Sequence, residues 1–233
     1  DIPVLYLGSG SNLLISDQGI RGLVIRLRDI CNIEFFGYVD QVGGWPVPTR
    51  HEESVLIRAE AGIPMRELAE KCEAWSLSGL EFTHGIPGTL GGAIFMNAGA
   101  YGGQMAEHVV AVRYMDHDGR LHIRTGEASN FAYRQSFYMD ERVLILDVLL
   151  QVVPGVKETI RQNMDYLMDK RQASQPLEFP SAGSIFKRPE GHYAGKLISD
   201  AGLKGCRIGG AVVSQKHAGF IINPEKQATA NDV

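Results

Sequence analysis

Two glycine-rich stretches contain the first residues in this sequence that could do chemistry. The first, "LGSGSN" at residues 7–12, follows a short apolar run and places Gly8, Ser9 and Gly10 where a strand should end. The second, residues 85–103, holds seven glycines in nineteen residues. Glycine lets backbone N–H groups converge on an anion, because no Cβ blocks the approach. If the two loops face each other, their amides could bracket a pyrophosphate without any lysine or arginine.

The spacing of these glycines matches neither of the common nucleotide-binding loops. Leu13 stands where the Gly-x-Gly-x-x-Gly pattern has its third glycine, and no Gly-Lys-Ser/Thr follows as a P-loop requires. Tight turns that only pack against each other are the alternative for both loops. Such a density of glycine is costly in conformational entropy for a mere connector, which favours a bound ligand.

Length and composition indicate a globular protein. The chain has 233 residues, of which 44% are apolar, enough for one large domain or two small ones. Its net charge of −4 and the absence of Lys/Arg runs argue against nucleic acid and anionic membranes as partners. No apolar segment reaches the roughly 18 residues that span a bilayer, and "DIPVLYLG" lacks the basic region of an export signal.

Three cysteines indicate the compartment. Cys31, Cys72 and Cys206 are odd in number and far apart, and they form no C-x-x-C pair. We therefore expect neither a disulfide framework nor a zinc site, and a reducing, cytoplasmic location. No His-x-x-x-His pair or carboxylate cluster with ligand spacing appears in the sequence, so no metal is expected.

Strand patterns dominate the first two thirds of the chain. The predicted strands are residues 4–7, 23–27, 55–62 and 143–153. A hairpin is predicted over residues 112–126, turning at Asp118-Gly119.

Two helices are predicted from apolar residues spaced three and four apart. The first begins near Pro64, and its apolar face consists of Leu68, Ala69, Cys72 and Trp75. The second spans residues 156–171, and its apolar face consists of Val156, Ile160, Met164, Leu167 and Met168. Residues 172–180 contain two prolines and are predicted to be a linker, with a domain boundary near Gln175.

Five segments, taken in order, carry a resemblance to a known family. They are "LGSGSNLL", "GLEFTHGIPGTLGGAIFMNAGAYG", "YRQS", "PSAGSIFKRP" and "GLKGCRIGGAVVSQKHAGFIIN". Together they resemble the FAD-dependent UDP-N-acetylenolpyruvoylglucosamine reductases, the MurB family of peptidoglycan synthesis. The likeness covers nearly the whole chain, and the short path from "YRQS" to "PSAGS" is similar to the family's second type.

The resemblance implies a fold and a cofactor. The fold is α+β: a PCMH/VAO-like FAD-binding module of two α+β subdomains over residues 1–174, followed by a separate α+β substrate-binding domain over residues 175–233. FAD is expected to be non-covalent, since "GSGSN" contains no histidine to anchor it. The implied cofactor residues are Gly8, Ser9, Gly10, Ser11, Asn12, Leu13, Gly85, Ile86, Pro87, Gly88, Thr89, Gly91, Gly92 and Ile145.

The reaction that the resemblance implies has two chemical requirements. NADPH reduces FAD, and a hydride then reaches the β-carbon of the enolpyruvyl ether in UDP-N-acetylglucosamine enolpyruvate, giving UDP-N-acetylmuramate. Enolate charge develops beside the substrate carboxylate, and Arg134 of "YRQS" can stabilise it through paired hydrogen bonds. A proton must also reach the α-carbon, and Ser184 of "SAGSIF" can donate it.

A serine hydroxyl is a weak acid, so Ser184 needs a neighbour that stabilises its alkoxide or resupplies its proton. Lys187, Lys196 and Lys216 are candidates, and the sequence does not choose among them. The alternative for Ser184 is a hydroxyl that caps a turn, and for Arg134 it is an ordinary surface ion pair.

Further residues are expected to bind the substrate, which is a small molecule. They are Tyr133, Arg188 and His217. For His217 the alternative is a hydrogen-bonding role in the core or on the surface. We expect the protein to act as a monomer.

The sequence departs from the family pattern in three places. The family's catalytic Glu lies beyond the "KHAGFIIN" segment, and no counterpart is found before Val233. The region before Ile2 is also short, so we expect a chain truncated at both ends. A lysine that some members of the first type carry before "AGS" has no counterpart, because Ser174 and Gln175 stand there.

Two rival functions stay open on the sequence alone. One is another FAD oxidase of the same fold class, although "SAGSIFKRP" followed by "GLKG" argues against it. The other is a non-catalytic flavin- or nucleotide-binding protein that kept the glycine loops. Flavin that NADPH reduces but the enolpyruvyl substrate cannot reoxidise would favour this second rival.

Overall fold

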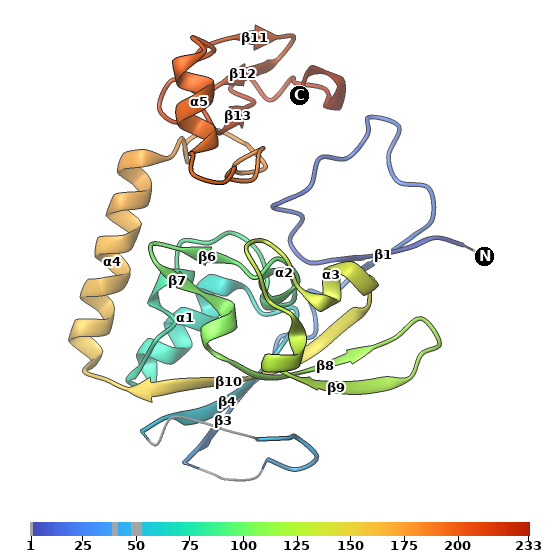
Figure 1. The fold of residues 1–233 in the computed structure, drawn as a ribbon, viewed down its shortest axis with the longest axis vertical. Helices are drawn as coiled ribbons and strands as arrows, with labels where there is room; N and C mark the ends of the chain where they lie inside the picture. Colours follow the sequence, from blue (N-terminus) through green and yellow to red (C-terminus); the bar gives the residue numbers. More distant parts are fainter. Residues whose placement is uncertain (1, 39–41, 48–52) are drawn as a thin grey trace. The chain divides into compact units, whose positions relative to one another are not determined.

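The computed structural model of the protein describes residues 2–38, 42–47 and 53–233 (Figure 1). Their contacts form two compact units. Unit 1 comprises the chain up to Val4, Gly10–Val24 and Asp169–Val233. Unit 2 comprises Leu5–Ser9 and Ile25–Met168. Each unit is described by itself.

Unit 2 is built on an antiparallel sheet of strand order β3-β4-β10-β8-β9, with β5 paired to the end of β10. The strands are β3 (Ile33–Gly37), β4 (Val55–Glu60), β5 (Leu77–Ser78), β8 (Val109–Met115), β9 (Leu121–Thr125) and β10 (Leu144–Pro154). The strands expected over residues 55–62 and 143–153 are confirmed, and so is the hairpin. Gly119 has a φ of +79°, as its Asp-Gly turn requires.

Both faces of this sheet are buried, which explains the long apolar run at residues 143–153. Side chains alternate along a strand. Ile57 of β4 therefore joins one core cluster, while its neighbour Leu56 joins a second cluster with Trp45. Helices α1 (Met65–Ala74) and α2 (Leu90–Phe95) pack into the first cluster, and Figure 1 shows them on one face of the sheet.

Helix α1 follows the prediction except at its end. It begins after Pro64 and buries Leu68, Ala69 and Cys72. The placement of Trp75 on its apolar face is wrong: Trp75 is the C-cap, is 37% exposed, and its ring lies 5.7 Å from that of Phe35.

Helix α4 (Lys157–Ser174) is shifted relative to its prediction. Ile160 and Met164 lie on its apolar face as expected and pack against Ala69 of α1, but Val156 precedes the helix and is 63% exposed. The linker expected from residue 172 is also wrong, because residues 172–174 are helical. The first proline of that segment is Pro176, and proline disfavours the helical conformation of the residue before it, which is Gln175.

The remaining elements are short. Strands β1 (Val4–Leu7) and β2 (Leu23–Arg26) were predicted from their apolar patterns, and the structure pairs them with each other. Unit 2 also contains β6 (Gly99–Ala100), β7 (Gly103–Gln104) and α3 (Phe137–Glu141). Unit 1 contains α5 (Ala194–Asp200) and the three-stranded sheet of β11 (Arg207–Ile208), β12 (Ala211–Val213) and β13 (Ile221–Ile222).

Residues 10–24 belong to unit 1 together with the C-terminal part of the chain, and one hydrogen-bonded contact joins the two segments. The Asp17 carboxylate accepts the backbone N–H of Ala230 at 2.9 and 3.0 Å.

No helix among the described residues is long and apolar enough to cross a bilayer.

Candidate active site

Gly8, in the first glycine-rich loop, lies against Thr89 of the second loop within unit 2. Gly8 directly follows β1, and Thr89 directly precedes α2. A Cβ placed on Gly8 would lie 2.4 Å from Thr89 Oγ1, closer than real Cβ atoms approach another heavy atom. A side chain at position 8 would therefore force Thr89 to shift, and the two loops meet at this contact.

The contact leaves a polar atom without a partner. Thr89 is 4% exposed, and its Oγ1 has no hydrogen-bond partner among the residues that the structure describes. Buried hydroxyls normally find a partner, since burial without one is costly. Gly88 beside it has a φ of +132°, in a region that side-chain-bearing residues rarely adopt. A phosphate oxygen of FAD fits as the missing partner of this hydroxyl.

Part of the second loop is engaged by the fold itself. The N–H of Leu90 donates to Ile63 O at 2.9 Å, and that of Gly91 donates to Ala61 O at 2.8 Å. A Cβ on Gly91 would lie 2.9 Å from the Cβ of Ala61. Gly91 therefore joins α2 to the end of β4, and its amide is not available to an anion.

The other residues expected at the cofactor are spread over both units. Gly8 and Ser9 belong to unit 2, whereas residues 10–13 belong to unit 1, where the N–H of Leu13 donates to Gly10 O at 3.3 Å. Ile145 is 4% exposed and packs in the first core cluster of unit 2. Its expected place near the flavin stays a prediction.

Arg134 is held by the second glycine loop. Its φ is +55°, an uncommon conformation for a residue with a side chain and one found at functional sites. The guanidinium donates to Gly99 O at 2.7 Å and to Asn97 O at 3.3 Å, and it lies 5.2 Å from the ring of Tyr133. Backbone carbonyls rather than a carboxylate orient it, so these contacts differ from an ordinary surface ion pair.

Asn97 is a supporting residue that the sequence analysis missed. It is 2% exposed, has a φ of +41°, and donates its side-chain amide to Ala132 O at 3.0 Å and Gln104 Oε1 at 3.1 Å. Its own side-chain oxygen accepts the N–H of Ala106 at 3.0 Å. Asn97 thus ties the Arg134 turn to the glycine loop. An Asn before a Gly-rich turn was the available signal, because Asn tolerates left-handed backbone.

Unit 1 brings Ser184 and His217 to the same glycine. A Cβ on Gly219 would lie 3.0 Å from His217 Cε1 and 3.6 Å from Ser184 Oγ. Ser184 pairs through its backbone with Phe220, and the N–H of Ile185 donates to Gly219 O at 2.9 Å. Two residues distant in sequence are therefore neighbours.

Other candidates in unit 1 have contacts of their own. The Arg188 guanidinium lies 5.2 Å from the ring of Tyr193. Lys196 pairs with Asp200 at 2.8 Å, one turn along α5. Lys216 donates to Gln172 O at 2.5 Å. The contacts of these two lysines do not involve Ser184.

His84, beside the second glycine loop, is a buried histidine. It is 8% exposed, burial lowers its pKa, and its Nδ1 has no hydrogen-bond partner within the described part of the chain. Among the described residues, no group of three His, Cys, Asp or Glu side chains is placed to hold a metal ion.

Two known protein families match this chain, one in its N-terminal part and one in its C-terminal part. Residues 1–124 match the family described as "FAD binding domain". Residues 175–233 match "UDP-N-acetylenolpyruvoylglucosamine reductase, C-terminal domain". These matches confirm the expected fold class and FAD as the cofactor.

Individual relatives carry the same name. The UDP-N-acetylenolpyruvoylglucosamine reductase of Lactococcus lactis subsp. cremoris is 43% identical over 96% of this chain and 69% of the relative. That of Clostridium beijerinckii is 44% identical over 100% of this chain and 71% of the relative. The crystal structure of MurB from Thermus caldophilus superimposes with a TM-score of 0.81 at 33% identity, covering 100% of this chain and 78% of that one. The chain belongs to the UDP-N-acetylenolpyruvoylglucosamine reductase family.

Proposed function

We propose that the protein reduces the enolpyruvyl ether of UDP-N-acetylglucosamine enolpyruvate to UDP-N-acetylmuramate in peptidoglycan synthesis, with NADPH as hydride donor. Family membership supports this reaction. One observation supports the cofactor site in particular: Gly8 packs against Thr89, whose buried hydroxyl has no hydrogen-bond partner among the described residues. FAD, when bound, supplies the hydride-transfer chemistry.

The division of labour along the chain is part of this proposal. Residues 1–174 hold FAD without a covalent link, with the two glycine loops at its diphosphate. Residues 175–233 bind the substrate. Three residues contact it, namely Tyr133, Arg188 and His217.

Arg134 answers the negative charge that develops on the substrate. A guanidinium has five N–H groups, and two hydrogen bonds to Asn97 O and Gly99 O orient it. The remaining N–H groups of the guanidinium can donate to the substrate carboxylate and the enolate oxygen. Because the carbonyls fix the cation in advance, it needs no reorganisation when that charge appears.

Ser184 gives its proton to the α-carbon. Its side chain is exposed in unit 1, and its hydroxyl has no hydrogen-bond partner among the described residues. Such a hydroxyl can approach a ligand without first breaking a bond within the protein.

The proposed setting is the cytoplasm, with the protein acting as a monomer on a small molecule and without nucleic acid or membrane as a partner. The cysteines suit a reducing compartment, since Cys31, Cys72 and Cys206 are all free thiols.

Replacement of Gly8 by alanine tests the cofactor site. The parent protein should be yellow, and acid precipitation should release its FAD into the supernatant. Gly8→Ala should weaken FAD binding about 5- to 150-fold, because forcing a methyl group into a packed site costs about 1–3 kcal/mol. Binding is measured by fluorescence titration of the dialysed protein.

Gly43→Ala is the matched control, since a Cβ at Gly43 meets nothing within 4 Å. It should bind FAD as the parent does. Equal affinity of Gly8→Ala and the parent would contradict the assigned site, and flavin that stays with the acid precipitate would contradict the non-covalent link.

A further inference from the structure

The hydrogen bond to the imidazole of His217 defines its tautomer. The backbone N–H of Gly219 donates to His217 Nδ1 at 3.1 Å. A backbone N–H can only donate, so Nδ1 must accept. A neutral imidazole whose Nδ1 accepts carries its proton on Nε2.

The ring is held in this orientation by close packing. A Cβ on Gly195 of α5 would lie 3.1 Å from His217 Cε1, and a Cβ on Gly219 would lie 3.0 Å from the same atom. The Phe220 ring contacts the imidazole edge-on at 4.9 Å between centroids. Ser214 Oγ accepts the backbone N–H of His217 at 3.3 Å and fixes the turn. A side chain at either glycine would require the ring to shift by a few tenths of an ångström.

The Nε2 edge of the ring is left for a ligand or a neighbour. Within the described residues, Nε2 has no hydrogen-bond partner, and it is not among the buried atoms that lack one. Ser184 Oγ flanks the same glycine, 3.6 Å from the Cβ position of Gly219. Of the lysines that could assist Ser184, Lys196 and Lys216 are engaged with Asp200 and Gln172.

We propose that His217 is a positioning residue that donates Nε2–H to Ser184 Oγ as the serine gives up its proton. The inference rests on the proposed function of Ser184. The O–H bond of Ser184 breaks, a C–H bond forms at the substrate α-carbon, and the electron pair stays on Oγ. His217 keeps its own proton and stabilises the alkoxide by a charge-assisted hydrogen bond. Water reprotonates Oγ after the product leaves.

Two substitutions separate this role from a packing role. In His217→Gln, the amide nitrogen reaches about as far as Nε2, whereas in His217→Asn it reaches only as far as Nδ1. In the protein from the complete reading frame, His217→Asn should slow flavin reoxidation by the enolpyruvyl substrate about 10- to 100-fold, as expected for losing a hydrogen bond to a charged group. His217→Gln should stay within about threefold of the parent, since it restores the donor.

Both variants should be reduced by NADPH at the parent rate. His192→Asn, at an exposed histidine of the same unit, is the control and should match the parent. Equal rates for the Gln and Asn variants would overturn the proposal, because a packing role does not depend on where the donor lies.

Ser184→Ala distinguishes failure of this inference from failure of the proposed function. If Ser184→Ala is slow, then Ser184→Ala/His217→Asn should be no slower, because the two side chains act as one unit. A slow Ser184→Ala with a fast His217→Asn would overturn only the role of His217. A fast Ser184→Ala would overturn the proposed acid as well.

The tautomer of His217 can be determined by NMR spectroscopy without measuring substrate turnover. Long-range ¹H–¹⁵N correlation spectra of the 233-residue chain distinguish protonation at Nε2 from protonation at Nδ1. We expect His217 to be protonated at Nε2. A proton on Nδ1 would overturn the proposal.

Discussion

Replacement of Ser184 by alanine is expected to slow flavin reoxidation by the enolpyruvyl substrate by well over about 10²-fold, the usual loss for removing a general acid. Flavin binding and reduction by NADPH should be preserved, since neither uses the hydroxyl. Stopped-flow absorbance follows both half-reactions in the protein from the complete reading frame.

Two further variants define the role of the hydroxyl. Ser184→Cys should retain some activity, because a thiol of similar size also donates a proton. Ser181→Ala, on the same loop, removes only a turn bond in which Ser181 Oγ accepts the N–H of Gly183 at 3.3 Å. It should react as the parent does. An alanine variant at position 184 that is reoxidised within a few fold of the parent would make Ser184 a turn residue only.

Arg134→Ala should slow the same half-reaction about 10²- to 10³-fold, the typical loss for one preorganised group that stabilises transition-state charge. Reduction by NADPH should be nearly unchanged, since the charge that Arg134 answers develops only in the second half-reaction. Arg134→Lys should also be slow, because one ammonium cannot reproduce the planar fork that Asn97 O and Gly99 O orient.

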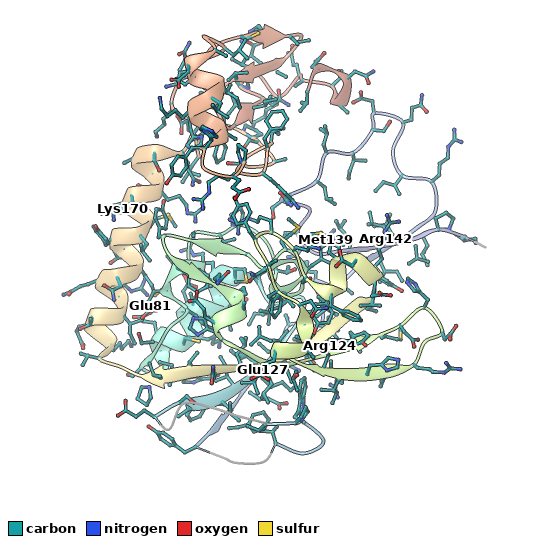
Figure 2. All side chains as sticks on the ribbon, in the orientation of Figure 1. Glu81, Arg124, Glu127, Met139, Arg142 and Lys170 are labelled. Carbon is teal, nitrogen blue, oxygen red and sulfur yellow. The ribbon has the colours of Figure 1, made fainter. Side chains whose placement is uncertain are left out.

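Arg142→Ala is the matched control for Arg134→Ala. Arg142, labelled in Figure 2, lies at the end of α3 and has the same φ of +55°. Alanine therefore meets the same backbone penalty at both positions. The control should keep both half-reactions at the parent rate. Equal slowing of both half-reactions in Arg134→Ala would contradict the role assigned to that residue.

Four strands of the central sheet, β4, β8, β9 and β10, were predictable because they have continuous or alternating apolar patterns. The run at residues 143–153 becomes β10, and Asp118-Gly119 turns the hairpin of β8 and β9. Short elements with mixed composition were not predicted, such as β3 and the three strands of unit 1. The pairing of such strands depends on neighbours that lie far away in the sequence.

The end of a helix was less predictable than its existence. Helix α4 runs to Ser174 because residues 172–174 contain no helix breaker, although they looked like part of a proline-rich linker. Trp75 has the spacing of the residues on the apolar face of α1, yet the helix ends before it and its ring contacts Phe35. Boundaries follow from capping and tertiary contacts that periodicity does not contain.

The site was predictable in residue type but not in its contacts. The glycine loops could be recognised, but the approach of Gly8 to Thr89 is a tertiary contact. The grouping of Gly10–Val24 with Asp169–Val233 likewise depends on contacts such as that of Asp17 with Ala230. The domain boundary near Gln175 and the site residues themselves stay predictions.

Anaerobic reoxidation of the bound flavin by the enolpyruvyl substrate tests the proposed reaction. The protein from the complete reading frame is reduced with one equivalent of NADPH and then mixed with UDP-N-acetylglucosamine enolpyruvate. The absorbance of oxidised flavin should return, and one UDP-N-acetylmuramate should form per flavin, since the substrate is the final hydride acceptor. Flavin that NADPH reduces but the enolpyruvyl substrate leaves reduced, with no product formed, would contradict it.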